Sequence, residues 1–303
     1  PLYSSAASDV YKRQELNHAA VNPAFSLMSS MSKGEDFSNQ YRFMTPAEAD
    51  AAFAPLAQRP VVFPDSTGSW LSTHRPDIVL VILESFTGHI LDMPEVMPRL
   101  KALSEEGIYF PHFYANSFRT DRGLVSILSG YPAQPTASIM KSPSKSQSLP
   151  AIARSLRKVG YDTEMIYGGD ADFTNMRSYF YATGYGRGMS CDDFTTEENS
   201  ARWGVPDHIT FPRVEKEIAR QTARPFMKTF LTLSSHEPFD VPMSRLEHPY
   251  LNSVAYTDSC LGAFVDTLRQ SPLWENLLIV FVADHTMRYP AGIQEHEVKR
   301  HHI

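Results

Sequence analysis

Residues 76–86, PDIVLVILESF, decide the fold. Six consecutive branched apolar side chains, from Ile78 to Leu83, form a run without polar interruption. A run of this kind, rich in isoleucine and valine, is typical of a β-strand buried on both faces of a parallel sheet. It ends at Glu84, so an acidic side chain stands at the carboxyl end of the predicted strand.

Similar apolar runs occur downstream, separated by amphipathic or charged segments. The further predicted strands cover 109–113, 163–167, 226–233 and 277–283. Helices are expected at 98–106, 123–128, 149–159, 211–222 and 250–269, several of them marked by proline at the start or glycine at the end. Strands alternating with helices predict parallel βαβ units and an α/β fold built as a layered sandwich with a mostly parallel sheet.

The composition allows a large core and argues against nucleic acid as the main partner. Of the 303 residues, 42% are hydrophobic, which is enough for one large α/β domain. The formal net charge is −6, so any anion site must be a local cluster of cations. Cys191 and Cys260 stand in no metal-type spacing, and a disulfide and two free thiols remain open for them.

The ends of the chain differ in texture from its middle. Residues 1–14 contain neither an initiator methionine nor a signal peptide, and we expect a non-native leader. Residues 15–75 are rich in proline, serine and alanine and are predicted to form a connecting segment before the domain. It contains one predicted helix, at 46–53, with Thr45 as its N-cap. Residues 76–303 are the predicted domain, expected to be incomplete at its carboxyl end. No apolar run approaches the roughly 18 residues that span a bilayer.

A short stretch, ANSFRTDRG at 115–123, crowds two arginines and an aspartate around Thr120 just before a predicted helix. Unpaired N–H groups and the dipole at a helix start favour an anion. A threonine in this position is most often a helix cap. The stretch alone therefore leaves two interpretations open, a surface turn and an anion site with a nucleophilic hydroxyl.

Side chains suited to chemistry stand at the ends of three predicted strands. In chain order they are Glu84, His236, Asp284 and His285. Each alone could be a cap, a surface acid or a turn residue. Because ligand sites gather outside the carboxyl ends of parallel strands, we expect these residues at one edge of the sheet, together with Thr120.

The residue types predict metal-assisted chemistry at that edge. Carboxylate and imidazole ligands suit Zn²⁺ or Mn²⁺. An alcohol is a poor nucleophile until a base or a metal activates it. A divalent ion held by Glu84, Asp284 and His285 would activate the Thr120 hydroxyl for attack on phosphorus. Nearby arginines, Arg122 in particular, would neutralise charge on the phosphoryl oxygens.

Six motifs in a fixed order carry a resemblance to a known family. The sequence resembles the lipoteichoic acid synthase family, phosphoglycerol transferases within the alkaline phosphatase and sulfatase superfamily. The similarity covers roughly residues 76–290. The motifs are LVILESF (80–86), SFRTDRG (117–123), WGVPDH (203–208), LSSHEPF (233–239), DSCLGAF (258–264) and VADH (282–285).

The resemblance implies a three-layer α/β/α sandwich with one catalytic metal, usually Mn²⁺, with Zn²⁺ or Mg²⁺ as alternatives. It implies phosphoglycerol transfer through a covalent ester on the nucleophile Thr120. The donor is expected to be an anionic lipid headgroup such as phosphatidylglycerol, and the acceptor a glycan or polyol. The family carries membrane helices before the catalytic domain, so residues 15–75 are expected to follow a missing membrane region. The domain is then expected on the extracytoplasmic face of the cell membrane. By motif position the metal ligands are Glu84, Thr120, Asp284 and His285, and the substrate contacts are His236, Asn175 and Arg177.

Two departures from the family pattern concern the headgroup and one turn. In DFTNMR, Thr174 stands where the family has tryptophan, and Arg177 is displaced by one residue. Thr286 replaces the usual glycine after the Asp-His pair. The first departure bears on the phosphoglycerol headgroup more than on the mechanism.

Three alternatives stay open. A hydrolytic phosphodiesterase would use the same threonine ester. A sulfuric ester hydrolase would need an oxidised cysteine or serine followed by Pro and Arg, which this sequence lacks. A non-catalytic module that binds anionic glycans would not need a full ligand set with a nucleophile.

The terminal histidines, which are His296, His301 and His302, could hold a second metal or form a solvated basic face.

Overall fold

The computed structural model describes residues 42–57 and 71–303 and the single residues 24 and 28. The chain forms two compact units, and the boundary between them lies between Trp70 and Leu71. In the first unit, helix α5 spans Pro46–Ala57, and the Thr45 hydroxyl accepts the Glu48 N–H. This confirms the predicted helix and its cap. The predicted leader and much of the predicted connecting segment lie outside the described residues.

The second unit is built on one five-stranded parallel sheet in the order β3-β2-β4-β1-β5. The apolar run of the first motif forms β1, which lies between β4 and β5, and its side chains are almost all buried. The strands are β1 (Asp77–Leu83), β2 (Asp162–Tyr167), β3 (Arg187–Met189), β4 (Phe226–Leu231) and β5 (Leu277–Ala283).

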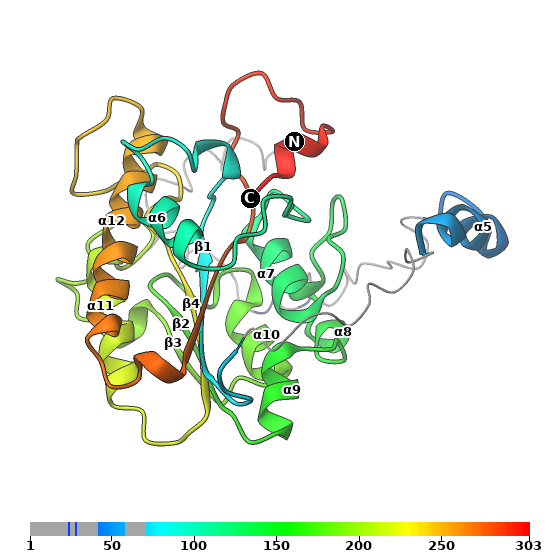
Figure 1. Cartoon of the computed structure of the whole chain (residues 1–303). Helices are drawn as coiled ribbons and strands as arrows, with labels where there is room; N and C mark the ends of the chain where they lie inside the picture. The colour runs from blue at the N-terminus through cyan, green and yellow to red at the C-terminus, as the bar shows by residue number, and fades with distance from the viewer. Residues whose placement is uncertain (1–23, 25–27, 29–41, 58–70) are drawn as a thin grey trace. The chain divides into compact units, whose positions relative to one another are not determined.

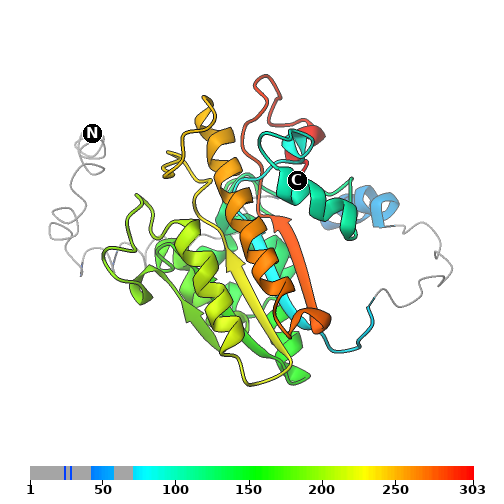
Figure 2. The same cartoon turned by 60° about the vertical axis from the view of Figure 1, so that its left-hand side comes forward.

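Helices cover both faces of the sheet, which confirms the three-layer α/β sandwich (Figures 1 and 2). One face carries α6 (Pro98–Glu106), α11 (Asp207–Ala219) and α12 (Pro249–Arg269). The other carries α7 (Thr120–Ser129), α8 (Pro143–Ser146), α9 (Ile152–Lys158) and α10 (Met176–Thr183). A separate apolar core fills each side of the sheet. Among the described helices, none is both long and apolar enough to cross a bilayer.

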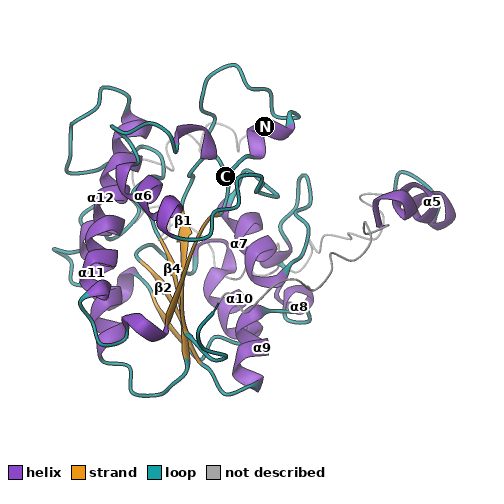
Figure 3. Cartoon of the chain, viewed as in Figure 1, coloured by secondary structure: helices purple, strands orange, loops and turns teal. Residues whose placement is uncertain are grey.

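Several elements differ from the sequence prediction (Figure 3), and α11 begins at Asp207, four residues before its predicted start. Helix α7 begins at Thr120 and not at Gly123, so the threonine is its first residue. Residues 109–113 form no strand, and the aromatic side chains there are about half exposed. Strand β3 and helix α10 were not predicted, because β3 has only three residues, one of them glycine.

Candidate metal centre

The centre lies where β1 and β5 end side by side. The register pairs Leu83 with Ala283, so Glu84 and Asp284 are the next residues of two neighbouring strands. The Asp284 N–H donates to the Leu83 carbonyl at 3.3 Å and continues the ladder by one step. The parallel pairing therefore brings together two carboxylates that are separated by 200 positions in the sequence.

Thr120 and His285 complete the group. The Thr120 hydroxyl donates to Glu84 Oε2 at 3.0 Å and lies 3.3 Å from His285 Nε2. His285 Nε2 lies 3.4 Å from Glu84 Oε1 and 3.5 Å from Asp284 Oδ2. The structure thus brings all four predicted metal-site residues to one place.

The donor set fits a divalent cation. Glu84, Asp284 and His285 are buried, and one ligand atom from each lies within 4.8 Å of the others. Asp284 Oδ2 is buried without a hydrogen-bond partner, although buried acceptors are almost always satisfied. Two carboxylates and an imidazole form the mixed oxygen and nitrogen set that Mn²⁺ and Zn²⁺ accept.

Burial opposes ionisation of these groups, and their mutual contacts decide the outcome. For Glu84, burial works against the charge, but the hydrogen bond and charge of His285 lower the pKa to about 2. For Asp284, burial and the Glu84 charge raise the pKa to about 7. For His285, burial would lower the pKa, yet Asp284 and Glu84 raise it to about 9. In the absence of a metal a proton balances the carboxylates, and a divalent ion could take its place.

Helix α7 reaches the centre because residue 123 is glycine. A Cβ there would lie 2.2 Å from the carbonyl oxygen of Asp284, so no larger side chain fits between the helix and β5. The close approach sets the first turn of α7, and Thr120 with it, against the ligand residues. The glycine of the SFRTDRG motif is thus a contact position and not a helix breaker.

Ser85 links the two carboxylates. Its hydroxyl donates to Glu84 Oε1 at 2.7 Å, and its N–H donates to Asp284 Oδ1 at 3.0 Å. The Ser85 backbone is left-handed, with φ at 59°, and the Tyr250 hydroxyl donates to its carbonyl at 2.8 Å. This serine belongs to the LVILESF motif, but nothing in the motif alone indicates its role.

His236 stands on the loop after β4, with its ring against Trp203. His236 Nδ1 lies 2.7 Å from the Glu237 carbonyl, which also accepts the Trp203 indole N–H at 2.6 Å. The two ring centroids are 5.1 Å apart in an edge-on contact. The charge of His236 contributes to the low pKa of Glu84, so the ring lies within electrostatic reach of the metal centre.

Asp207 holds the start of the same loop. Its buried carboxylate accepts the N–H groups of Leu233 at 2.9 Å and Ser234 at 3.3 Å, and the Thr257 hydroxyl at 2.7 Å. Burial nevertheless raises the pKa of Asp207. The aspartate of WGVPDH therefore supports the start of the loop that carries His236, a role that its motif alone did not indicate.

The three other predicted substrate contacts bind protein groups in the structure. Arg122 Nη1 donates to the Pro135 carbonyl at 2.7 Å. Arg177 pairs with Asp172 at 2.9 Å and Asp192 at 3.0 Å. The Asn175 amide donates to a backbone carbonyl, that of Lys141, at 3.4 Å. Their contact with substrate stays a prediction.

Another pair of cations stands closer to the start of α7. The Asp121 carboxylate, buried beside Thr120, lies 3.9 Å from Arg119 Nε and 3.9 Å from Lys141 Nζ. Both basic side chains are more than half exposed, and neither distance is that of a hydrogen bond. Lys141 comes from a separate turn, so the local motif could not have indicated it.

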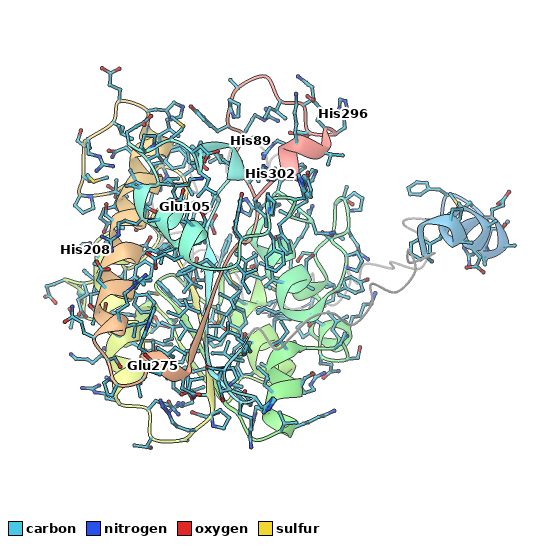
Figure 4. All side chains as sticks on the ribbon, in the orientation of Figure 1. His89, Glu105, His208, Glu275, His296 and His302 are labelled. Atoms are coloured by element: carbon cyan, nitrogen blue, oxygen red, sulfur yellow. The ribbon has the colours of Figure 1, made fainter. Side chains whose placement is uncertain are left out.

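The terminal histidines do not gather around a second ion. His301 Nδ1 lies 3.1 Å from the Ala115 carbonyl, and His302 Nε2 lies 2.9 Å from the Pro111 carbonyl. Figure 4 shows His302 beside His89, with His296 further out on the loop. Within the described ranges, the three ligands of the centre are the one cluster of metal-type side chains.

The comparisons with known proteins agree with the fold and give the family. The sulfatase family model matches residues 76–301, and the chain belongs to this family. The expectation that it is an enzyme of the alkaline phosphatase and sulfatase superfamily, similar to lipoteichoic acid synthases, is confirmed.

Two curated relatives are similar to the chain in sequence. The chain is 26% identical over 241 residues to the lipoteichoic acid synthase-like protein YvgJ of Bacillus subtilis, covering 73% of this chain and 38% of that protein. It is 27% identical over 241 residues to the lipoteichoic acid synthase of Staphylococcus aureus, covering 70% and 36%. The chain thus spans less than half the length of these relatives.

Two solved structures share the fold. An alkaline phosphatase superfamily protein from Vibrio parahaemolyticus is 29% identical with a TM-score of 0.68, over 75% of this chain and 58% of that one. The lipoteichoic acid synthase LtaP of Listeria monocytogenes is 22% identical with a TM-score of 0.64, over 75% and 60%. The second likeness concerns the fold alone.

Proposed function

We propose that the chain carries the catalytic domain of a metal-dependent phosphoglycerol transferase that works through a covalent ester on Thr120. One observation carries the proposal: the Thr120 hydroxyl, at the first position of α7, lies 3.0 Å from Glu84 Oε2 and 3.3 Å from His285 Nε2. A surface cap would not need two buried groups aimed at its oxygen. The likeness to lipoteichoic acid synthases supports the phosphoglycerol group.

The residues divide the work in the following way. A divalent ion held by Glu84, Asp284 and His285, Mn²⁺ by family likeness, would supply the Lewis acidity that activates an alcohol and offsets phosphoryl charge. The Thr120 oxygen attacks phosphorus, the bond from phosphorus to the diacylglycerol oxygen breaks, and the threonine proton ends on that leaving oxygen. An acceptor hydroxyl oxygen then attacks the same phosphorus, the bond from phosphorus to the Thr120 oxygen breaks, and the acceptor's proton ends on Thr120.

Surrounding side chains would bind the donor. Arg119 and Lys141, each 3.9 Å from the Asp121 carboxylate next to Thr120 in the sequence, would offset the charge that gathers on the non-bridging oxygens. His236 would contact the headgroup from the loop after β4. Arg122, Asn175 and Arg177 would add further contacts with the donor. The donor is an anionic lipid such as phosphatidylglycerol and the acceptor a glycan or polyol, so we place the domain on the extracytoplasmic face of the cell membrane.

The test is a search for the covalent adduct. The chain is incubated with Mn²⁺ and phosphatidylglycerol, and its intact mass is measured. We expect a glycerophosphate adduct that disappears in Thr120→Ala and persists in Thr267→Ala, which removes a hydroxyl from the exposed face of α12.

Each other outcome has a definite meaning. An adduct that persists in Thr120→Ala overturns the role of this hydroxyl. An adduct of another mass keeps the mechanism and replaces the donor. Release of sulfate from an aryl sulfate without any adduct would move the chain to sulfuric ester hydrolysis.

A further inference from the structure

A buried arginine, Arg300, lies behind the metal centre. Only 7% of its surface is exposed, although arginine is almost never buried unless it is paired. Its Nη1 donates to the Thr286 carbonyl at 3.1 Å and to the Met287 carbonyl at 2.9 Å. The guanidinium therefore binds the turn that directly follows the ligand His285.

The Thr286 carbonyl joins this arginine to the metal ligand. His285 Nδ1 lies 3.3 Å from the same carbonyl oxygen, which has a second lone pair for it. An Nδ1–H donated there leaves the lone pair of Nε2 facing Glu84, Asp284 and Thr120. Ligand histidines commonly have their other ring nitrogen held in this way, and the contact sets both tautomer and ring orientation.

The Thr286 side chain adds reciprocal hydrogen bonds with Arg300. Its hydroxyl donates to the Arg300 carbonyl at 2.5 Å and accepts from Arg300 Nη1. The family pattern has glycine at this position, which would offer neither bond. The threonine that departs from the pattern thus forms a reciprocal pair with Arg300.

The same guanidinium also contacts the loop segment that leads to Thr120. Its central carbon lies 4.6 Å from the centre of the Phe118 ring, a cation–π distance. Phe118 stands two residues before Thr120, at the entry to α7. Arg300 therefore contacts the segments on both sides of the centre, the ligand turn after β5 and the entry to α7.

We propose that Arg300, through the Thr286 carbonyl and the Phe118 ring, is a positioning residue that fixes the His285 ligand and the Thr120 nucleophile relative to each other. The inference rests on the proposed metal centre. It adds a residue that no motif of the sequence indicated, 15 positions beyond the ligand that it orients.

The experiment measures metal affinity, apart from activity. Arg300→Met keeps the length and apolar contact of the side chain but removes every donor. Titration calorimetry of the chain with Mn²⁺ should show a dissociation constant raised about tenfold or more, since loss of a group that holds a ligand typically costs 10–100-fold. Arg300→Lys, which keeps the charge but not the fork, should recover part of the loss. Arg288→Met removes an exposed cation from the same loop and should bind Mn²⁺ like the wild type.

A structural role alone predicts a different result. It would lower the melting temperature of Arg300→Met and leave the dissociation constant of the folded protein unchanged, and that result overturns the inference while the metal centre stands. Should Arg300→Met fail to fold, a folded Arg300→Lys with wild-type affinity overturns it equally. A wild-type chain that binds no Mn²⁺ removes the metal centre and this inference together.

Discussion

Ser85 shows how one residue organises the centre. Its backbone has an unfavourable φ of 59°. In this conformation it donates hydrogen bonds to both carboxylates, to Glu84 from its hydroxyl and to Asp284 from its N–H. A left-handed conformation of a non-glycine residue costs about 1–3 kcal/mol and persists only where the surroundings impose it. The Tyr250 hydroxyl, bound to the Ser85 carbonyl, is part of those surroundings.

Two substitutions at Ser85 separate its hydroxyl from its backbone strain. Ser85→Ala keeps the strain and the N–H but loses the bond to Glu84, and should weaken Mn²⁺ binding by about tenfold. Ser85→Gly loses the same bond but relieves the strain, and should be more stable than Ser85→Ala by about 1 kcal/mol with equally weak Mn²⁺ binding. Calorimetry and urea unfolding measure the two effects. Ser259→Ala, on α12, is the control, and wild-type Mn²⁺ affinity in Ser85→Ala would contradict the assigned role.

At the scale of elements, the centre depends on how closely α7 approaches β5. The carbonyl of Asp284 occupies the space that a side chain at residue 123 would need. Gly123→Ala should cost about 1–3 kcal/mol of stability, as overpacking does. Because the helix must move, Thr120 leaves its place, and transfer activity should fall by about 100-fold, the loss that a displacement of about 1 Å can cause.

Gly130, at the other end of α7, is the matched control. A Cβ there meets no neighbour within 4 Å, although φ is 62°. Gly130→Ala should therefore lose about 1 kcal/mol of stability from backbone strain and keep its activity. Equal activity losses in the two alanine variants would show that helix stability, and not the contact with Asp284, matters for the reaction.

The elements also show what the sequence could predict. β1 and β5 match their predicted ranges, because both are apolar runs without polar interruption. β1 lies inside the sheet and is buried, whereas β5 is the edge strand of the described sheet and is mostly half-buried. Helix α7 begins three residues before its predicted start at Gly123, because the apolar run begins only at Leu124 while tertiary contacts hold the polar first turn. Residues 109–113 have the side chains of a strand, but the only pairing described there is one antiparallel bridge just beyond them, between Tyr114 and His302, which is too short to form a strand.

The metal ligands could be predicted from the sequence better than the substrate contacts could. Glu84 and Asp284 were predictable because they follow strands whose register the apolar pattern fixes. Arg122 and Arg177 are held by a carbonyl and by carboxylates from loops whose paths no sequence pattern determines. The contacts of Lys141 with Asp121 and of Arg300 with the turn after His285 depend on such loops too, so only the folded chain shows them.

At the scale of the whole molecule, the centre makes stability depend on pH. In the metal-free fold the pKa of His285 is raised from 6.5 to about 9, so its stabilising effect is complete below pH 6.5 and lost as the pH rises to 9. That shift corresponds to about 3 kcal/mol. The raised pKa of Asp284, about 7, acts in the same direction between pH 4 and 7, because ionising this buried carboxyl costs the folded state stability. The lowered pKa of Glu84, about 2, acts only below pH 4.5, where stability falls as the carboxylate is protonated.

Mn²⁺ should remove this loss at high pH. The ion binds the deprotonated ligands, so its apparent affinity rises with pH while the bound proton of the metal-free fold is lost. Thermal unfolding from pH 6 to 9 should show a melting temperature that falls without metal and stays level with saturating Mn²⁺, so that the difference widens toward pH 9. His285→Asn, which cannot take up the proton, should flatten the metal-free curve. Parallel curves with and without Mn²⁺ would mean that the ion does not replace the proton at His285, and hence that it binds elsewhere on the chain.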